Sequence, residues 1–134
     1  QHYTTLATNK IINHGFTNTS SKLFFNIARK CQFVISTSFS DASATSISLA
    51  MRTGLIPIVT LDTGHDVDGF GFEIDTGSVE SLASILKKSK NFPQTQLDRM
   101  SKEAYNYSKN FTKKTFSNSF SKFITEFEFK KNNI

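Results

Sequence analysis

The stretch Cys31–Thr60, CQFVISTSFSDASATSISLAMRTGLIPIVT, indicates the fold of this chain. It holds two short apolar runs, Phe33–Ile35 and Ile56–Val59, separated by a polar loop and a helix-like segment. Short apolar runs joined through a helix are typical of buried strands in a parallel sheet. The loop Ser36–Ser43 follows the first run directly. In an open parallel sheet, ligands bind at that carboxyl edge, so this loop is the first candidate site.

The loop is rich in hydroxyl side chains and contains one carboxylate, Asp41. Backbone amides at the start of the helix that follows favour a bound phosphate. Ionised Asp41 only accepts hydrogen bonds, so it suits ligand hydroxyls better than a phosphate. The alternative interpretation of Asp41 is a helix N-cap. The pattern therefore predicts a site for a ligand that has both hydroxyl and phosphate groups.

On the N-terminal side, Ile11-Ile12 followed by His14-Gly15 predicts the end of a short strand and a turn. Helical spacing then predicts a helix that begins after Thr19 or Ser20, with Leu23, Phe24, Ile27, Ala28 and Cys31 on its apolar side. Cys31, next to an apolar strand, is interpreted as a small buried hydrophobe rather than a nucleophile.

On the C-terminal side, Gly54 suits a helix C-cap and Pro57 is expected near a strand start. A glycine-containing loop, 62–71, precedes a brief strand at Phe72–Ile74. Three helices are predicted next, marked by apolar residues in helical spacing: Val79, Leu82, Ala83 and Leu86; then Leu97, Met100, Ala104 and Tyr107; then Phe116, Phe120, Phe123, Ile124 and Phe127. The last stripe indicates core or a domain-docking surface. Alternating strands and helices predict an α/β fold with a Rossmann-like parallel sheet and flanking helices.

Length and composition limit the function classes. The chain has 134 residues, enough for about one domain, and a formal net charge of +5. Its lysines cluster near residues 87–90 and after residue 109, which is compatible with a solvated face or with peripheral contact at a membrane. Aromatic–basic motifs of nucleic-acid binding are missing, so no nucleic-acid partner is expected. One cysteine excludes an internal disulfide and favours a reducing, cytoplasmic compartment. The start at Gln1 favours a fragment of a longer protein.

Acidic residues around His65 raise the question of a metal. Asp62, Asp66 and Asp68 lie close together in the sequence, but Gly64 stands where a calcium loop needs its first ligand. We therefore expect no metal site. His65 and Asp66 are left open between a functional site and a turn.

An ordered set of these motifs resembles the donor-binding half of group 1 glycosyltransferases, enzymes of the GT-B fold that use nucleotide sugars. The set comprises His14-Gly15-Phe16, Phe33–Asp41, Leu49–Val59, Gly64-His65-Asp66, Phe70-Gly71-Phe72 and Asn110-Phe111-Thr112. The resemblance covers nearly the whole chain. It implies a donor-binding domain over residues 1–110, incomplete at its N-terminus, and a C-terminal helix over 111–134 that packs back on this domain or on its partner domain.

The resemblance also implies residue roles. Asp41 takes the place of the acidic residue that contacts hydroxyls of the donor sugar, with Ser38 in the same loop. Amides around Ser43, Ala44, Thr45 and Ser46 would approach the diphosphate, and His14 with Gly15 would face the donor cleft. The family's second acidic residue, which holds the ribose, is Leu49 here, and the diphosphate-binding Arg and Lys would lie before this chain begins.

The resulting hypothesis is a retaining, metal-independent glycosyltransferase fragment, inactive alone. It would bind a nucleoside diphosphate sugar as donor substrate, with no cofactor, and would need a separate N-terminal acceptor domain to build a glycan, glycolipid or polysaccharide. Two alternatives stay open. One is a degenerate, non-catalytic Rossmann-like binding module, which Leu49 favours. The other is a phosphate-binding flavodoxin-like domain with a different activity.

Overall fold

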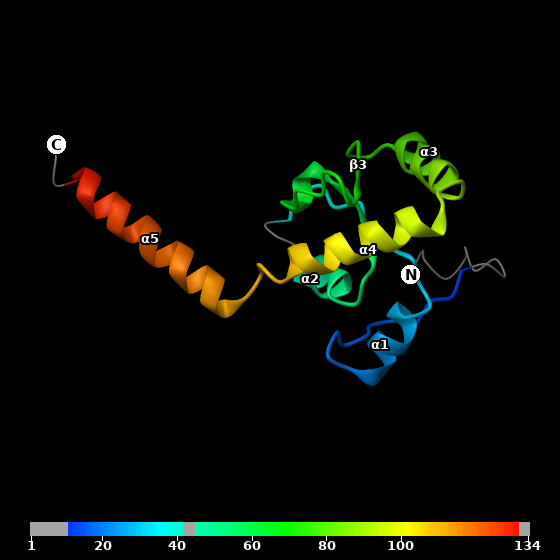
Figure 1. Cartoon of the computed structure of the whole chain (residues 1–134), viewed down its shortest axis with the longest axis horizontal. Helices are drawn as coiled ribbons and strands as arrows, with labels where there is room; N and C mark the ends of the chain where they lie inside the picture. Colours follow the sequence, from blue (N-terminus) through cyan, green and yellow to red (C-terminus); the bar gives the residue numbers. More distant parts are fainter. Residues whose placement is uncertain (1–10, 42–44, 132–134) are drawn as a thin grey trace.

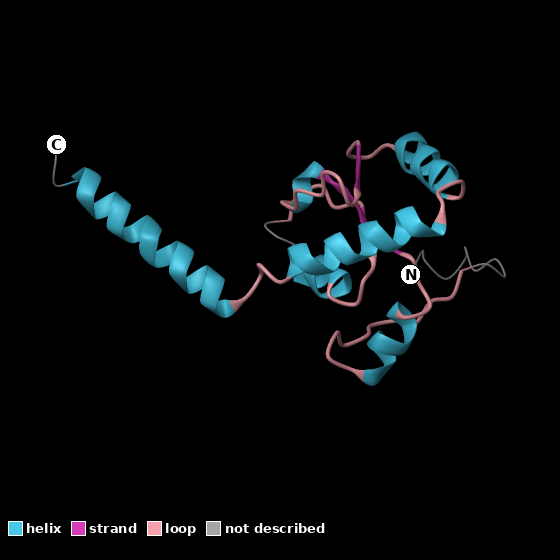
Figure 2. Ribbon diagram, viewed as in Figure 1, coloured by secondary structure: helices cyan, strands magenta, loops and turns pink. Residues whose placement is uncertain are grey.

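A three-stranded parallel sheet lies at the centre of the molecule, with helices around it (Figures 1 and 2). The computed structural model describes residues 11–41 and 45–131, with side chains of the last helix described as far as Phe127. The elements are α1 Lys22–Ala28, β1 Phe33–Ser36, α2 Thr45–Met51, β2 Ile56–Thr60, the 3-10 turn η1 Leu61–Thr63, β3 Phe72–Ile74, α3 Val79–Ser89, α4 Gln94–Ser108 and α5 Lys113–Lys131. The predicted α/β class is confirmed.

β2 is the central strand and every residue in it is buried. It pairs in parallel with β1, where Phe33 lies opposite Ile56, and with β3, where Ile58 lies opposite Phe72. Pro57 is the second residue of β2 and precedes the first β3 pair. Because proline has no N–H to donate, this position near the strand start removes little from the ladder, as predicted.

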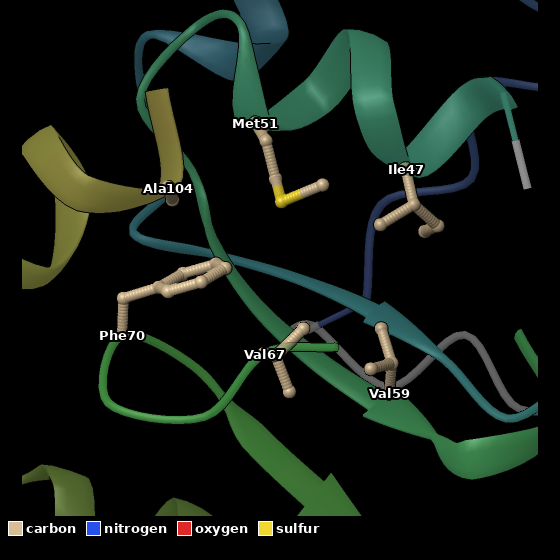
Figure 3. Close-up of a cluster of buried hydrophobic side chains, with 6 residues drawn as sticks. All are labelled: Ile47, Met51, Val59, Val67, Phe70 and Ala104. Carbon is tan, nitrogen blue, oxygen red and sulfur yellow. The ribbon is translucent and has the colours of Figure 1, made fainter. Parts of the chain in front are cut away.

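One face of the sheet is covered by α2 and α4, which also contact each other (Figure 1). Ile47 and Met51 of α2 meet Val59 of β2 and Ala104 of α4, and two residues of the 64–71 loop, Val67 and Phe70, complete the cluster (Figure 3). Met51, Val59 and Ala104 are fully shielded from solvent. This cluster is the main core.

Aromatic rings connect β1 and β3 to the start of α4. The rings of Phe33 and Phe72 lie 6.4 Å apart between centroids, and Phe72 lies 5.8 Å from Phe92. Phe92 belongs to the break before α4, where Pro93 takes the N-cap position. α3 begins at its predicted place, because the Ser78 hydroxyl accepts a hydrogen bond from the Ser81 N–H at 3.0 Å.

Two glycines permit close packing around β2. Gly54 has φ +88° in the turn after α2, and its carbonyl accepts a hydrogen bond from the Ser101 hydroxyl of α4 at 2.6 Å. At Gly71, an added Cβ would lie 2.8 Å from both Pro57 and Val67 side chains. A side chain at Gly71 would therefore push the 64–71 loop away from β2.

Two N-terminal predictions are wrong. Ile11 and Ile12 form no strand; their side chains are 59% and 77% exposed. Cys31 is exposed rather than buried, because α1 ends at Ala28 and a hydrogen-bonded turn follows, in which the Cys31 N–H donates to the Ala28 carbonyl. The α1 helix itself is confirmed, with Ser21 as its N-cap, one residue after the predicted position.

α5 extends away from the rest of the molecule (Figure 1). The aromatic stripe predicted for it is present, but it is not core: Phe116, Phe120, Phe123 and Phe127 are 54–71% exposed. The docking interpretation of the stripe, and the packing of this helix on another domain, stay predictions. Across the described residues, no helix combines the length and apolar character needed to cross a membrane.

Candidate functional site

The loops that follow the three strands meet at the carboxyl edge of the sheet. The Thr60 hydroxyl, at the end of β2, donates to the Ser38 carbonyl at 2.6 Å. The Asp41 N–H donates to the Asp62 carbonyl at 3.0 Å. Thr60 is fully buried, so its hydroxyl gains most from having a partner. These two bonds hold the loop after β1 against the loop after β2.

A second connection joins the loop after β2 to the turn after β3. The Thr76 hydroxyl donates to a carboxylate oxygen of Asp62. The Asp75 N–H donates to the Ser81 hydroxyl at 3.2 Å, which links the same turn to the first turn of α3. The loops after β1, β2 and β3 are therefore fixed to one another, as a ligand site at this edge requires.

Phe39 closes one side of this edge. Its ring lies against Gly77, where an added Cβ would be 3.2 Å from the ring. Phe39 and Gly77 line a small cavity of about 180 Å³, together with Thr37, Ile74, Asp75, Ser78, Val79 and Leu82. The Phe39 ring is nevertheless 71% exposed, so an apolar surface is available beside the polar loop.

The Asp41 side chain is exposed while its backbone is fixed by Asp62. Within residues 11–41 and 45–131 the Asp41 carboxylate makes no hydrogen bond or ion pair, so with respect to these residues it can accept hydrogen bonds from a ligand. The three loops, 37–41, 61–71 and 75–78, contain Asp residues but neither Lys nor Arg. The electrostatics of this edge therefore favour hydroxyl donors over a bare phosphate.

The structure brings together only some of the site residues that the sequence predicted. Ser38 is half-buried in the fixed loop, and its hydroxyl donates to the Ser40 carbonyl at 3.3 Å. Thr45 and Ser46 begin α2 and are exposed on different sides, since they line different cavities. Ser43 and Ala44 lie outside the described residues. α2 has only seven residues, so its amides by themselves make a weak anion site.

His14 and Gly15 are exposed in the segment before α1, which lies beside that helix (Figure 1). The Gly15 N–H donates to the Asn13 side chain at 2.8 Å. No hydrogen bond joins either residue to the described part of the Asp41 loop. The structure therefore does not bring these two residues to the edge where Ser38 and Asp41 lie.

A larger cavity, of about 510 Å³, lies between α2 and the start of α5. Leu49 and Arg52 of α2 line it, together with Phe111 between α4 and α5 and Phe116 of α5. Leu49, which the sequence resemblance places where glycosyltransferases have a ribose-binding carboxylate, is 39% exposed here. We call this cavity the α2–α5 groove.

The 64–71 loop is structural in its central residues. His65 is 2% exposed, and its ring lies 5.2 Å from Phe111 and 6.3 Å from Tyr107. Burial raises the pKa of Tyr107; the Asp66 backbone lowers it in part, and the Asp66 carboxylate raises it further. Residues 11–41 and 45–131 contain no group of three His, Cys, Asp or Glu residues placed to hold a metal ion.

Reasoning from the sequence missed Thr60, Asp62 and Thr76 as the residues that join the loops. Each lies within three residues after a predicted strand, which is a usable signal, because the carboxyl ends of parallel strands share one edge. No protein-family model matches the chain, and comparisons with curated proteins and with solved structures gave no significant match.

Proposed function

We propose that this chain is the donor-binding part of a GT-B glycosyltransferase that uses a nucleoside diphosphate sugar. The observation that supports this most is the exposed Asp41 carboxylate, presented by a loop that Thr60 and Asp62 fix at the carboxyl edge of a parallel sheet. A fixed backbone with an exposed carboxylate is the arrangement that positioning a sugar requires, because orientation of the donor must be set before reaction.

The chemistry of the edge suits the sugar part of such a donor. Asp41 accepts hydrogen bonds from sugar hydroxyls, and the exposed Phe39 ring offers an apolar surface next to them. Ser38 keeps the loop in place through its carbonyl, so it acts as a positioning residue.

In the reaction, the bond between the anomeric carbon and the diphosphate oxygen breaks, and the diphosphate leaves with the electron pair. The acceptor hydroxyl forms the new bond to the anomeric carbon, and its proton passes to the departing diphosphate oxygen. Charge that develops on the diphosphate must be stabilised. Since the three loops contain no Lys or Arg, this charge falls to amides at the start of α2 and to basic groups outside these loops, in the part of the enzyme that the proposal places before this chain.

Calorimetric titration of the full-length protein with UDP, GDP and ADP and their sugar conjugates tests the proposal. We expect one nucleotide class to bind, and its sugar conjugate to bind more tightly than the free diphosphate. In Asp41→Ala, the added affinity of the sugar should fall about tenfold or more, because a hydrogen bond to a charged group contributes about 1.5–3 kcal/mol. Binding of the free diphosphate should be kept.

The matched control is Asp98→Ala. Asp98 is an exposed residue of α4, where its carboxylate accepts a hydrogen bond from the Gln94 side chain at 2.9 Å. This variant should bind like the wild type. If no diphosphate or sugar conjugate binds to well-folded protein, the donor-site proposal is overturned.

A non-catalytic Rossmann-like module is the second candidate. It is favoured by Leu49, an exposed apolar residue on the outer face of α2 that cannot accept a hydrogen bond from a ribose hydroxyl. Leu49→Glu distinguishes the two candidates. If a nucleotide site exists but lacks its ribose contact, Leu49→Glu should strengthen nucleotide binding; a pure binding module would show no nucleotide affinity with either residue.

A further inference from the structure

The strongest feature that the proposed function leaves unused is the aromatic stripe on α5. The stripe is formed by Phe116, Phe120, Phe123 and Phe127, with Ile124 beside it, all exposed. Among the described residues, the ring pairs of the stripe lie along its own helix: Phe116 stacks on Phe120 with centroids 6.0 Å apart, and Phe123 on Phe127 at 6.3 Å. Apolar surface of this kind marks an interaction site.

We propose that the stripe pairs with the α5 helix of a second copy of this chain, in antiparallel orientation. The four phenylalanines are spaced by four, three and four residues, the alternation of a coiled-coil seam. This spacing is symmetric about the point between Ser121 and Lys122. An antiparallel pair centred there puts Phe116 opposite the partner's Phe127, and Phe120 opposite the partner's Phe123. The stripe is thus self-complementary, as a two-fold interface requires.

The area of the stripe agrees with a dimer. The four rings are 71%, 54%, 60% and 59% exposed. At about 200 Å² for each phenylalanine, they present roughly 500 Å² per copy. A pair would bury about 1,000 Å² from these side chains alone, the size at which specific interfaces begin.

Charge complementarity at the α2–α5 groove fixes the direction of pairing. The antiparallel arrangement directs the C-terminal half of the partner helix toward Phe116, which lines this groove with Leu49 and Arg52. Arg52 is exposed and makes no ion pair within the described residues. Glu126 lies 3.8 Å from Lys122 in its own helix, with both side chains more than 60% exposed, so this pair is weak. Arg52 can therefore pair with the partner's Glu126 at the rim, where charges determine register.

Multi-angle light scattering of the purified 134-residue chain over a range of concentrations gives the first test. We expect a mass that rises to twice the 15.0 kDa of the chain. The double variant Phe120→Ser/Phe123→Ser should stay monomeric. Its circular dichroism spectrum should remain that of a folded α/β chain. The control Asn118→Ala/Thr125→Ala changes the opposite face of α5 and should still dimerise.

Charge reversal and crosslinking test the direction. Arg52→Glu should weaken the dimer at least several-fold, and Arg52→Glu/Glu126→Arg should restore it. In a Cys31→Ser background, mixed Phe116→Cys and Phe127→Cys chains should form the mixed disulfide, identified by peptide mass, in preference to either symmetric one. Symmetric crosslinks would show parallel pairing and overturn the proposal.

Two further results would overturn it. One is a monomer at every concentration. The other is binding of the monomer to vesicles containing anionic lipid that depends on the same phenylalanines, which would identify a membrane rather than a second copy as the partner of the stripe.

Discussion

α4 and α5 are neighbours in the sequence, and both have apolar residues in helical spacing, yet one is core and the other is not. Met100 and Ala104 of α4 are 4% and 0% exposed, packed toward α2 and β2. On α5 the larger Phe120 and Phe123 are 54% and 60% exposed. Apolar periodicity therefore indicates which face of a helix is apolar, but it does not indicate what covers that face.

The two helices also differ in polar connections to the body. The Ser101 hydroxyl of α4 donates to the Gly54 carbonyl, and the Arg99 guanidinium lies 3.3 Å from the Gly69 carbonyl. The hydrogen bonds described for α5 side chains are local: the Thr125 hydroxyl donates to the Ser121 carbonyl at 3.0 Å, and the Thr115 hydroxyl lies 2.8 Å from that of Thr112, just before the helix. Stability of the monomer should therefore depend on α4 far more than on α5.

The largest expected effect is that of Met100→Ala. Removing this side chain leaves a cavity between α4 and the body and should lower the free energy of unfolding by about 2–5 kcal/mol. Urea unfolding followed by circular dichroism measures it. A loss below 1 kcal/mol would mean that α4 is not held by its buried face, and the contrast between the two helices would disappear.

Ser101→Ala should have an intermediate effect. It removes the hydrogen bond to the Gly54 carbonyl at 2.6 Å and leaves a half-buried acceptor without its partner, at a cost of about 1 kcal/mol. The matched variant is Ser121→Ala on α5, an exposed position where alanine improves helix propensity slightly. Both are compared by the urea midpoint, and equal shifts would contradict the assignment of α4 to the core.

Tyr107, at the end of α4, should make the stability of the chain depend on pH in the alkaline range. Burial raises its pKa above the ordinary 10.0. Between pH 10 and the folded pKa, the unfolded chain loses this proton while the folded chain keeps it. The contribution of Tyr107 to the free energy of unfolding is therefore fully present below pH 10 and is lost as the pH rises through the folded pKa. Urea unfolding at several alkaline pH values should show a smaller decline in Tyr107→Phe. Tyr105→Phe, which removes an exposed hydroxyl from the same helix, should decline like the wild type.

Phe120→Ala should have the smallest effect on the monomer. At concentrations where the chain is monomeric, the exposed ring loses little contact, so the change should lie within about 0.5 kcal/mol. Urea unfolding at low and high protein concentration measures it. A loss of several kcal/mol at low concentration would show that α5 packs on the body of its own chain.

Sequence patterns predicted each described β-strand and α-helix, although not the 3-10 turn η1, because these elements have clear periodicity. Ser78 before α3, and Asn91-Phe92-Pro93 before α4, are local signals that need no tertiary information. The error at Ile11-Ile12 has the opposite cause. Two apolar residues are too few to distinguish a strand from an exposed segment, and only pairing with a neighbour decides.

For the candidate site, the sequence by itself determined the place: polar residues after a buried strand, with Asp41 among them, belong at the carboxyl edge of a parallel sheet. Only the tertiary structure decided how that loop is held, by Thr60 and Asp62, and that the segment with His14 and Gly15 lies beside α1 (Figure 1). It also decided that Cys31 and the α5 phenylalanines face solvent. The reason is physical: local spacing determines the direction of a side chain within its element, whereas burial depends on which other elements arrive.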